Sequence, residues 1–177
     1  LDKYEKEPLK EIIITFILGC LTVVPVLIVS PLINNLLKIP YTFVDFLGSG
    51  LVGGAEIKTL VYTFIGIALV EEYFKFLVLI KYSFKRECFN EPMDGLVYGV
   101  VVSLGFATYE NYTYVYEWAS TVAKEENFDF LEFSYLVAKG RSYSAIPMHG
   151  LNGAVMGYYF GLYAFSGNKN YLALSLI

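Results

Sequence analysis

Long apolar runs are the feature of this sequence that most restricts its fold. The runs from Ile12 to Leu37 and from Val61 to Ile80 are each long enough to cross a bilayer as a helix. Stretches such as Ile12 to Ile28 do not alternate polar and apolar residues, as the strands of a membrane barrel do. In lipid, only helices and closed barrels satisfy their own backbone hydrogen bonds. The sequence therefore predicts an all-α fold, a polytopic bundle of transmembrane helices.

Composition supports a protein surrounded by membrane lipid. Hydrophobic residues make up 56% of the 177 residues and charged residues 17%, which is far from the balance of a soluble domain. The formal net charge of -4 and the lack of a basic stripe argue against a nucleic-acid partner. Cys20 lies in an apolar run and Cys88 in a charged loop, so we expect neither a disulfide nor a cysteine metal site. We expect one membrane-embedded domain over residues 1–177 of an integral membrane protein, trimmed at both ends.

Four spans and part of a fifth are expected from the apolar runs and the turn residues between them. Small residues at every fourth position of the third span, Gly95, Gly99 and Ser103, predict a face for close helix packing, as do Gly153 and Gly157 in the fourth. The expected spans are Ile12 to Leu37, then Ile57 or Leu60 to Lys81–Arg86, then Asp94 to about Tyr116, then a span that begins within Phe133 to Arg141, bends at Pro147 and ends at Ser166-Gly167, and finally a partial span from Tyr171 to Ile177.

Two segments between these spans have a different character. Residues Ile39 to Gly54 are rich in aromatic residues and glycines, which predicts an interfacial or re-entrant segment. Residues Glu117 to Glu132 hold five acids against Lys124 and predict a solvated loop, the longest segment outside the membrane. The lysines and arginines of the short loops place the N-terminal segment and residues 81–91 on the cytoplasmic side, and the acidic insert on the outer side.

Three ionisable residues, Glu71, Glu72 and Lys75, lie in the middle of the second apolar run. A charge at the centre of a bilayer costs at least about 2.5 to 3.5 kcal/mol, so such residues normally face the interior of a bundle. At helical spacing Lys75 is one turn from both carboxylates, which leaves one acid incompletely neutralised and able to take a proton from water. The alternative is a structural ion pair that joins two helices, and this stretch alone leaves both interpretations open.

Polar residues on two further spans are expected at a similar depth. At a rise of roughly 1.5 Å per residue, Glu71 lies roughly 15 Å and Glu110 roughly 10 Å below the outer surface, and His149 lies roughly 12 Å beyond Arg141. Three spans that place Glu, Glu and His in one layer indicate a common site in the outer half of the membrane. Taken singly, His149 could be a satisfied core residue and Glu110 a plain partner for Arg141.

Three ordered motifs resemble those of a known family. They are Glu71-Glu72-x-x-Lys75, the stretch from Asp94-Gly95 to Glu110-Asn111, and Arg141 with Ile146-Pro147-Met148-His149-Gly150. Over about residues 60 to 165 they resemble the motifs of the PrsW family of bacterial and archaeal intramembrane proteases, which are related to the CAAX-processing and bacteriocin-processing membrane endopeptidases. The resemblance implies a prokaryotic plasma-membrane protease that cuts a single-span membrane protein, such as an anti-sigma factor, near the outer face.

The chain departs from the CAAX-processing branch at three positions. That branch has an Arg one position after the place of Lys75, a His at the place of Glu110, and an Asn four residues after the last His. Here the residue four after His149 is Gly153, and Asn152 is three after.

The chemistry expected from these residues is hydrolysis of a peptide bond, with Glu71, helped by Glu110, removing a proton from water. His149, with Asn152 or Asn111, would donate to the oxyanion or to the leaving amine. The expected catalytic residues are Glu71, Glu72, Glu110 and His149, and the expected supporting residues are Lys75, Asn111, Arg141 and Asn152.

The same Glu71, Glu110 and His149 could instead hold Zn²⁺, whose bound water has a pKa of about 7. The sequence has no His-x-x-x-His or Cys ligand pair, which favours a metal-independent glutamate protease without a cofactor. Two other classes remain open: a proton-coupled transporter with a buried relay, and a non-catalytic membrane scaffold. A transporter predicts an internal repeat, and we find none in the sequence.

Overall fold

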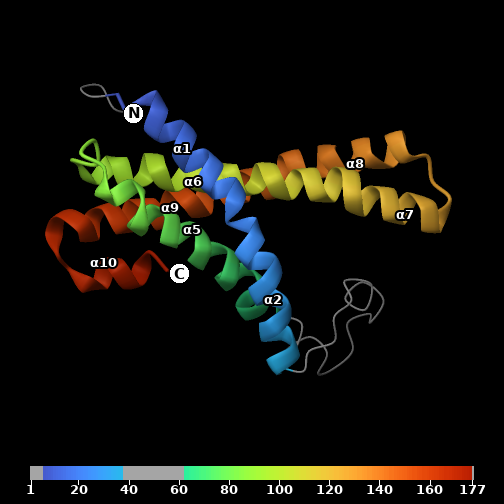
Figure 1. Cartoon of the computed structure of the whole chain (residues 1–177), viewed down its shortest axis with the longest axis horizontal. Helices are drawn as coiled ribbons and strands as arrows, with labels where there is room; N and C mark the ends of the chain where they lie inside the picture. The colour runs from blue at the N-terminus through green and yellow to red at the C-terminus, as the bar shows by residue number, and fades with distance from the viewer. Residues whose placement is uncertain (1–5, 38–61, 177) are drawn as a thin grey trace.

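The computed structural model describes residues 6–37 and 62–176, and every regular element within them is a helix (Figure 1). For these residues the all-α prediction is confirmed. The expected interfacial segment at Ile39 to Gly54 and the expected start of the second span lie outside the described residues.

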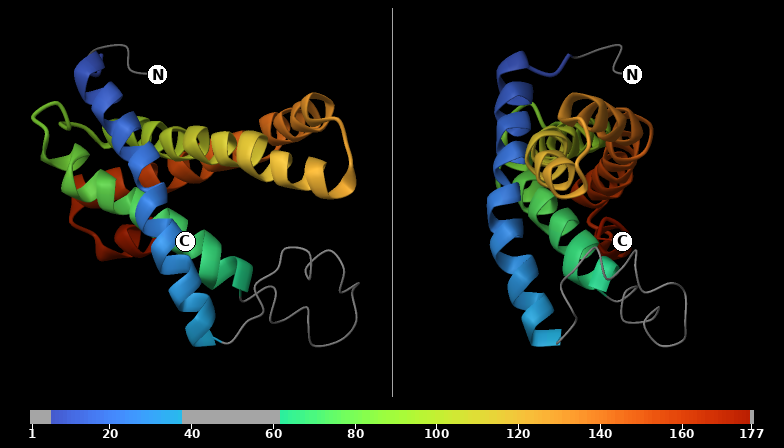
Figure 2. Two further views of the ribbon diagram at one scale, coloured as in Figure 1. Left: turned by 45° about the vertical axis from the view of Figure 1, so that its right-hand side comes forward. Right: turned by 90° about the vertical axis from the view of Figure 1, so that its right-hand side faces the viewer.

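The first two helices, α1 (Leu9–Leu21) and α2 (Val23–Leu37), form an almost continuous rod along one side of the molecule (Figure 2). They are separated only at Thr22, whose hydroxyl donates to the carbonyl oxygen of Gly19 at 2.6 Å. Pro25 follows within the next turn and has no N–H to continue the helical ladder. In the described part of the chain, Leu9–Ile33 alone is a helix both long and apolar enough to cross a membrane, and an 18-residue stretch within it has a mean hydropathy of 2.9.

The central helices carry the first and second motifs. The π-helix η1 (Tyr62–Ala68) leads into α5 (Leu69–Lys81), which is followed by a short 3-10 turn, η2 (Ser83–Lys85). Helix α6 (Pro92–Tyr112) starts at a capping box, in which the Glu91 backbone N–H donates to Asp94 at 2.8 Å.

One long rod extends beyond α6. The π-helix η3 (Thr113–Trp118) and α7 (Ala119–Glu126) continue α6 without a break. After Asn127, which has a left-handed φ of 58°, the chain returns as α8 (Phe130–Tyr143), so that α7 and α8 form a hairpin that projects from the bundle (Figure 1). The prediction of a loop from Glu117 to Glu132 is therefore wrong, because residues up to Glu126 are helical, although most side chains of this segment are exposed as expected. Ala119 and Ala123, one turn apart, are buried and give α7 the apolar stripe that this pairing requires.

The expected fourth span is also divided differently from the prediction. Helix α8 ends at Tyr143, and α9 (Ala145–Ser166) begins after Ser144, so the break precedes Pro147. Pro147 lies in the first turn of α9, where a backbone N–H has no helical partner in any case. Helix α9 ends at Gly167, with φ of 70°, and α10 (Lys169–Leu174) follows, shorter than the partial span expected from Tyr171 to Ile177.

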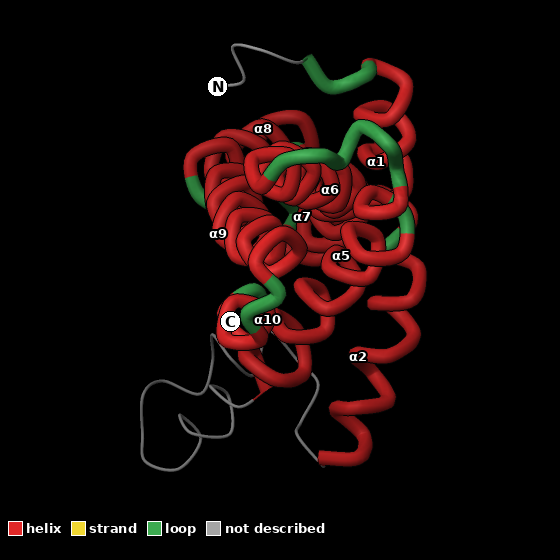
Figure 3. Tube along the Cα trace, turned by 90° about the vertical axis from the view of Figure 1, so that its left-hand side faces the viewer, coloured by secondary structure: helices red, strands yellow, loops and turns green. Residues whose placement is uncertain are grey.

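The core is built by close contact between α6 and α9, which are seen nearly end-on in Figure 3. A Cβ atom built on Gly157 would overlap the carbonyl oxygen of Gly95, and one on Gly99 would overlap that of Gly153. The two small-residue faces expected from the sequence therefore pack on each other. This contact sets the carboxyl-terminal part of α6 beside the first turns of α9, and α5 packs against both helices.

Candidate active site

Lys75 on α5 is the centre of a polar cluster inside the bundle. Its side chain is fully buried, with 0% of its surface exposed. The ammonium nitrogen Nζ lies 2.8 Å from Glu72 Oε1 and 3.9 Å from Glu71 Oε2, so the expected pairing with both carboxylates is confirmed. The same nitrogen lies 4.0 Å from the centre of the Phe106 ring, where the negative face of the ring stabilises the cation.

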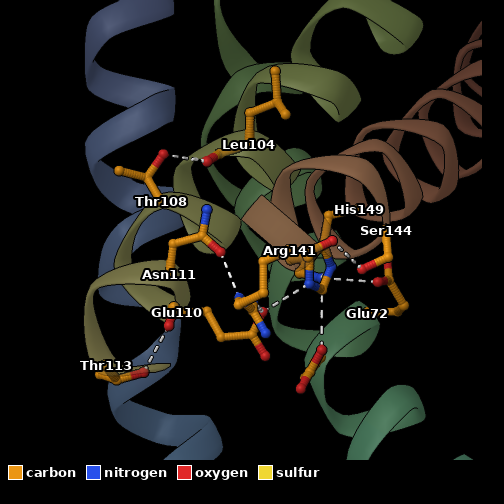
Figure 4. Close-up of polar contacts among 12 residues, drawn as sticks. Glu72, Leu104, Thr108, Glu110, Asn111, Thr113, Arg141, Ser144 and His149 are labelled. Carbon is orange, nitrogen blue, oxygen red and sulfur yellow. Dashed lines mark hydrogen bonds and ion pairs between the residues drawn. The ribbon is translucent and has the colours of Figure 1, made fainter. Parts of the chain in front are cut away.

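His149, in the second turn of α9, links α5 to α6. Its Nδ1 lies 3.0 Å from Lys75 Nζ. Its Nε2 lies 2.9 Å from Glu110 Oε2 (Figure 4). The imidazole also contacts the Phe106 ring edge-on, with centroids 5.3 Å apart. The ring is therefore held on both nitrogens and along one side.

Arg141, at the end of α8, joins the cluster from the projecting hairpin. It donates from its terminal nitrogen to Glu110 Oε2 at 2.5 Å and from Nε to Asn111 Oδ1 at 2.6 Å (Figure 4). Its guanidinium lies 4.2 Å from the centre of the Tyr114 ring. Glu110 is thus a partner of Arg141, as the simpler interpretation expected, and it contacts His149 as well.

Glu71, Glu110 and His149 come from three different helices and converge. One ligand atom of each lies within 4.8 Å of the others, and the side chains are 12%, 17% and 13% exposed. The three motifs, well separated along the chain, meet at one point.

The cluster holds one more acid than base. Glu71, Glu72 and Glu110 face two permanent cations, Lys75 and Arg141, which leaves one negative charge in excess. Glu72 Oε2 is buried and has no hydrogen-bond partner among the residues that the structure describes, although Glu72 Oε1 is held by Lys75. Such an unsatisfied carboxylate oxygen is rare in a protein interior.

Of the two asparagines expected to support the site, one contacts the cluster within the described residues and the other does not. Asn111 accepts the hydrogen bond from Arg141 and so helps to position that side chain. Asn152 is exposed on α9, one turn beyond His149, and among the described residues no hydrogen bond joins it to the cluster.

Two aromatic residues that contact the cluster, Phe106 and Tyr114, were not predicted from the sequence as part of the site. Phe106 lies four residues before Glu110 and Tyr114 lies four residues after it, so both share the side of the helix that carries this acid. Helical spacing around Glu110 is the signal that could have identified them.

The donor set of Glu71, Glu110 and His149 fits a catalytic zinc ion in kind and in number. Carboxylate oxygens and imidazole nitrogens are ordinary zinc ligands, and catalytic sites use three protein ligands with one open position. The grouping of three such atoms within 4.8 Å is compatible with this set.

Comparison with known proteins agrees with the motifs and their arrangement. The family model described as "PrsW family intramembrane metalloprotease" matches residues 7–177. The chain is 33% identical over 170 residues to Protease PrsW of Clostridioides difficile (strain 630), a match that covers 96% of this chain and 60% of that protein. It is 27% identical over 179 residues to Protease PrsW of Bacillus subtilis (strain 168), covering 99% of this chain and 67% of that protein.

The chain thus spans about three fifths of the length of the first of these curated relatives. No solved structure matches it. Because the family model matches nearly the whole chain and the three motifs of the resemblance meet in one cluster, the chain belongs to the PrsW family of intramembrane proteases.

Proposed function

We propose that this chain is the catalytic membrane domain of an endopeptidase that hydrolyses a peptide bond in a membrane-anchored protein. The convergence of Glu71, Glu110 and His149 beside the buried Lys75 is the observation that carries the proposal. It supplies a carboxylate to accept a proton, an imidazole to donate one, and fixed charges around both.

Glu71 is the proposed general base. Lys75 holds Glu72 at 2.8 Å, and Glu110 accepts from Arg141 and contacts His149, whereas Glu71 lies 3.9 Å from the nearest cation. Among the described residues its carboxylate makes no hydrogen bond. Glu71 is therefore the carboxylate of the three that is free to bind and deprotonate a water molecule.

His149 is the proposed proton donor, and the other charged residues keep it and the base in place. Nε2 of His149 points to Glu110, and the ring lies close to the carboxylate of Glu71. From this place His149 can donate to the oxyanion or to the leaving amine. Arg141 donates to the same oxygen of Glu110, Oε2, and so helps to fix this carboxylate.

Zinc has a defined place in this arrangement. Glu71, Glu110 and His149 are the residues that would hold it, and a bound zinc ion supplies a water molecule with a pKa of about 7. Cleavage that persists in the presence of a strong chelator would assign the reaction to the glutamate-type mechanism. Cleavage that is lost and then restored by added Zn²⁺ would assign it to the zinc-dependent one.

The proposed substrate is a single-span membrane protein of the anti-sigma-factor type in a prokaryotic plasma membrane, cut near the outer face. The length of the helical rod supports this position. Helices α6, η3 and α7 have 21, 6 and 8 residues in succession, which is roughly 50 Å at 1.5 Å per residue and exceeds a hydrocarbon core of about 30 Å. In the proposed polytopic bundle, the α7–α8 hairpin leaves the membrane on the side where Glu110 lies.

The test compares cleavage of tagged single-span membrane proteins by the full chain in proteoliposomes. Glu71→Gln keeps the size of the side chain and removes its ability to take a proton, so we expect the rate to fall at least about a hundredfold. The matched control is Glu117→Gln, the same change at an exposed position on η3, which should leave the rate unchanged. Cleavage at the original rate by the Glu71→Gln variant would overturn the proposed function.

A further inference from the structure

Lys75 holds the imidazole of His149 through an unusual kind of contact. Its ammonium nitrogen lies 3.0 Å from Nδ1 of His149 and 2.8 Å from Glu72 Oε1. An ammonium group has three donors and no acceptor, so the nitrogen that it contacts must accept the hydrogen bond. Nδ1 of His149 therefore carries a lone pair and no proton.

The opposite nitrogen has the complementary environment. Nε2 of His149 lies 2.9 Å from Glu110 Oε2, and a carboxylate oxygen accepts a hydrogen bond. A proton on Nε2 satisfies this contact, and the lone pair on Nδ1 satisfies the contact with Lys75. Either alternative, the other tautomer or the imidazolium ion, would set an Nδ1–H donor against the buried ammonium of Lys75.

We propose that, in the metal-free chain, Lys75 is a positioning residue that fixes the tautomer of His149, with the proton on Nε2. In most sites an acceptor such as a carboxylate or a backbone carbonyl receives the Nδ1–H, which leaves Nε2 free to act as a base or a metal ligand. A lysine in that place reverses the assignment. His149 then acts as a hydrogen-bond donor through its Nε2–H, and the task of the base is left to Glu71.

The proposal rests on the proposed function only for this catalytic consequence, since the tautomer itself can be observed without turnover. His149 is the single histidine of the chain. Protein labelled with ¹⁵N-histidine and purified through a histidine-free tag therefore gives the signals of this residue alone. We would record the ¹⁵N spectrum of the chelator-treated full chain in lipid nanodiscs.

The expected spectrum has a protonated Nε2 and an unprotonated Nδ1 in the wild type. Lys75→Met, which keeps the length of the side chain and removes the donor, should give a mixture of tautomers or the Nδ1–H form, and Lys75→Arg should restore the original spectrum. The matched control is Lys81→Met at the exposed end of the same helix, which should have no effect. In the cleavage assay Lys75→Met should lower kcat at least tenfold with KM unchanged.

A protonated Nδ1 in the wild type, in either the neutral or the charged ring, would overturn the proposal without any variant being needed. An unchanged spectrum in a folded Lys75→Met variant would also overturn it. The Glu71→Gln variant separates the two proposals: it should keep the wild-type spectrum while losing cleavage. A Glu71→Gln variant that still cleaves would refute the proposed function and leave the tautomer assignment standing.

Discussion

Arg141 connects two neighbouring residues of α6 through one planar group. It bonds Glu110 at 2.5 Å and Asn111 at 2.6 Å, and it also lies over the Tyr114 ring. A lysine has a flexible point charge and cannot reproduce two bonds in a fixed fork. The planar guanidinium group of Arg141, and not its charge alone, therefore holds Glu110 in place.

We expect Arg141→Lys to lower the cleavage rate roughly ten- to a hundredfold, the equivalent of one charge-assisted hydrogen bond of about 1.5 to 3 kcal/mol. The rate in proteoliposomes measures this effect. The control is Lys139→Ala, which removes an exposed cation two residues before Arg141 on α8. This variant should cleave at the wild-type rate. Equal rates for Arg141→Lys and the wild type would show that charge alone is sufficient.

The sequence predicted which residues of the polar cluster lie together better than it predicted the contacts that each of them makes. The spacing of Glu71, Glu72 and Lys75 specifies one helical turn, which is a local property, and the pairing followed from it. The exposure of Asn152 depends on how α9 is rotated against its neighbours, which no local spacing determines. The same holds for Phe106 as the ring beneath Lys75.

Between elements, the contact of α6 with α9 depends on glycines that let two backbones touch. Gly157 is surrounded by backbone atoms of Gly95 and Gly99, which cannot move aside as a side chain can. Gly150, seven residues earlier on α9, has only a side-chain atom of Leu104 nearby, at 3.6 Å from an added Cβ. The same substitution should thus have different effects at these two positions.

We expect Gly157→Ala to lower the free energy of unfolding by about 1 to 3 kcal/mol or more, because the two helices must separate to make room. Gly150→Ala should be neutral or slightly stabilising, because alanine is the better helix former by about 1 kcal/mol. Thermal unfolding in detergent, followed by the loss of helical circular dichroism, measures both. Similar destabilisation by the two variants would contradict the close contact of α6 with α9.

The sequence predicted the packing faces of α6 and α9 and failed on the α7–α8 hairpin. Small residues at every fourth position are a direct signal of close approach, and the structure uses them so. In residues Glu117 to Glu132 the many acids obscured a short apolar stripe, Ala119 and Ala123, which a single helix partner is enough to bury. The break at Ser144 was missed because Pro147 is the stronger local signal, although its place in the first turn of α9 is harmless.

For the molecule as a whole, the end of the bundle away from the site is closed by polar contacts with the N-terminal segment. Glu7 accepts a hydrogen bond from Tyr98, and Glu11 accepts one from Tyr82 at 2.6 Å. Burial raises the pKa of Glu7 from 4.5 to about 6, against the effect of the Tyr98 hydrogen bond and with a further contribution from Asp94. The folded protein therefore holds a proton on Glu7 in a pH range where the unfolded chain has released it.

Between about pH 4.5 and 6 the folded state binds more protons at Glu7 than the unfolded state does. The contribution of Glu7 to the free energy of unfolding is therefore complete below pH 4.5 and is lost as the pH rises through about 6. Glu7→Gln removes the titrating group. We expect the Tm of the wild type to fall relative to that of the variant as the pH rises through this range. If the Tm values of the two proteins change in parallel between about pH 4 and 7, the raised pKa of Glu7 in the folded state is contradicted.

The bond between Arg141 and Asn111 joins residues 30 positions apart and closes a loop whose far end is the turn at Asn127. In terms of chain entropy, closing a flexible loop becomes only slowly more costly with its length, by about 0.6 kcal/mol for each doubling. Residues added at the Asn127 turn therefore change the energy of this closure very little, and Glu110 at its base keeps its partner. The hairpin can therefore lengthen at its turn while the cluster at its base stays the same.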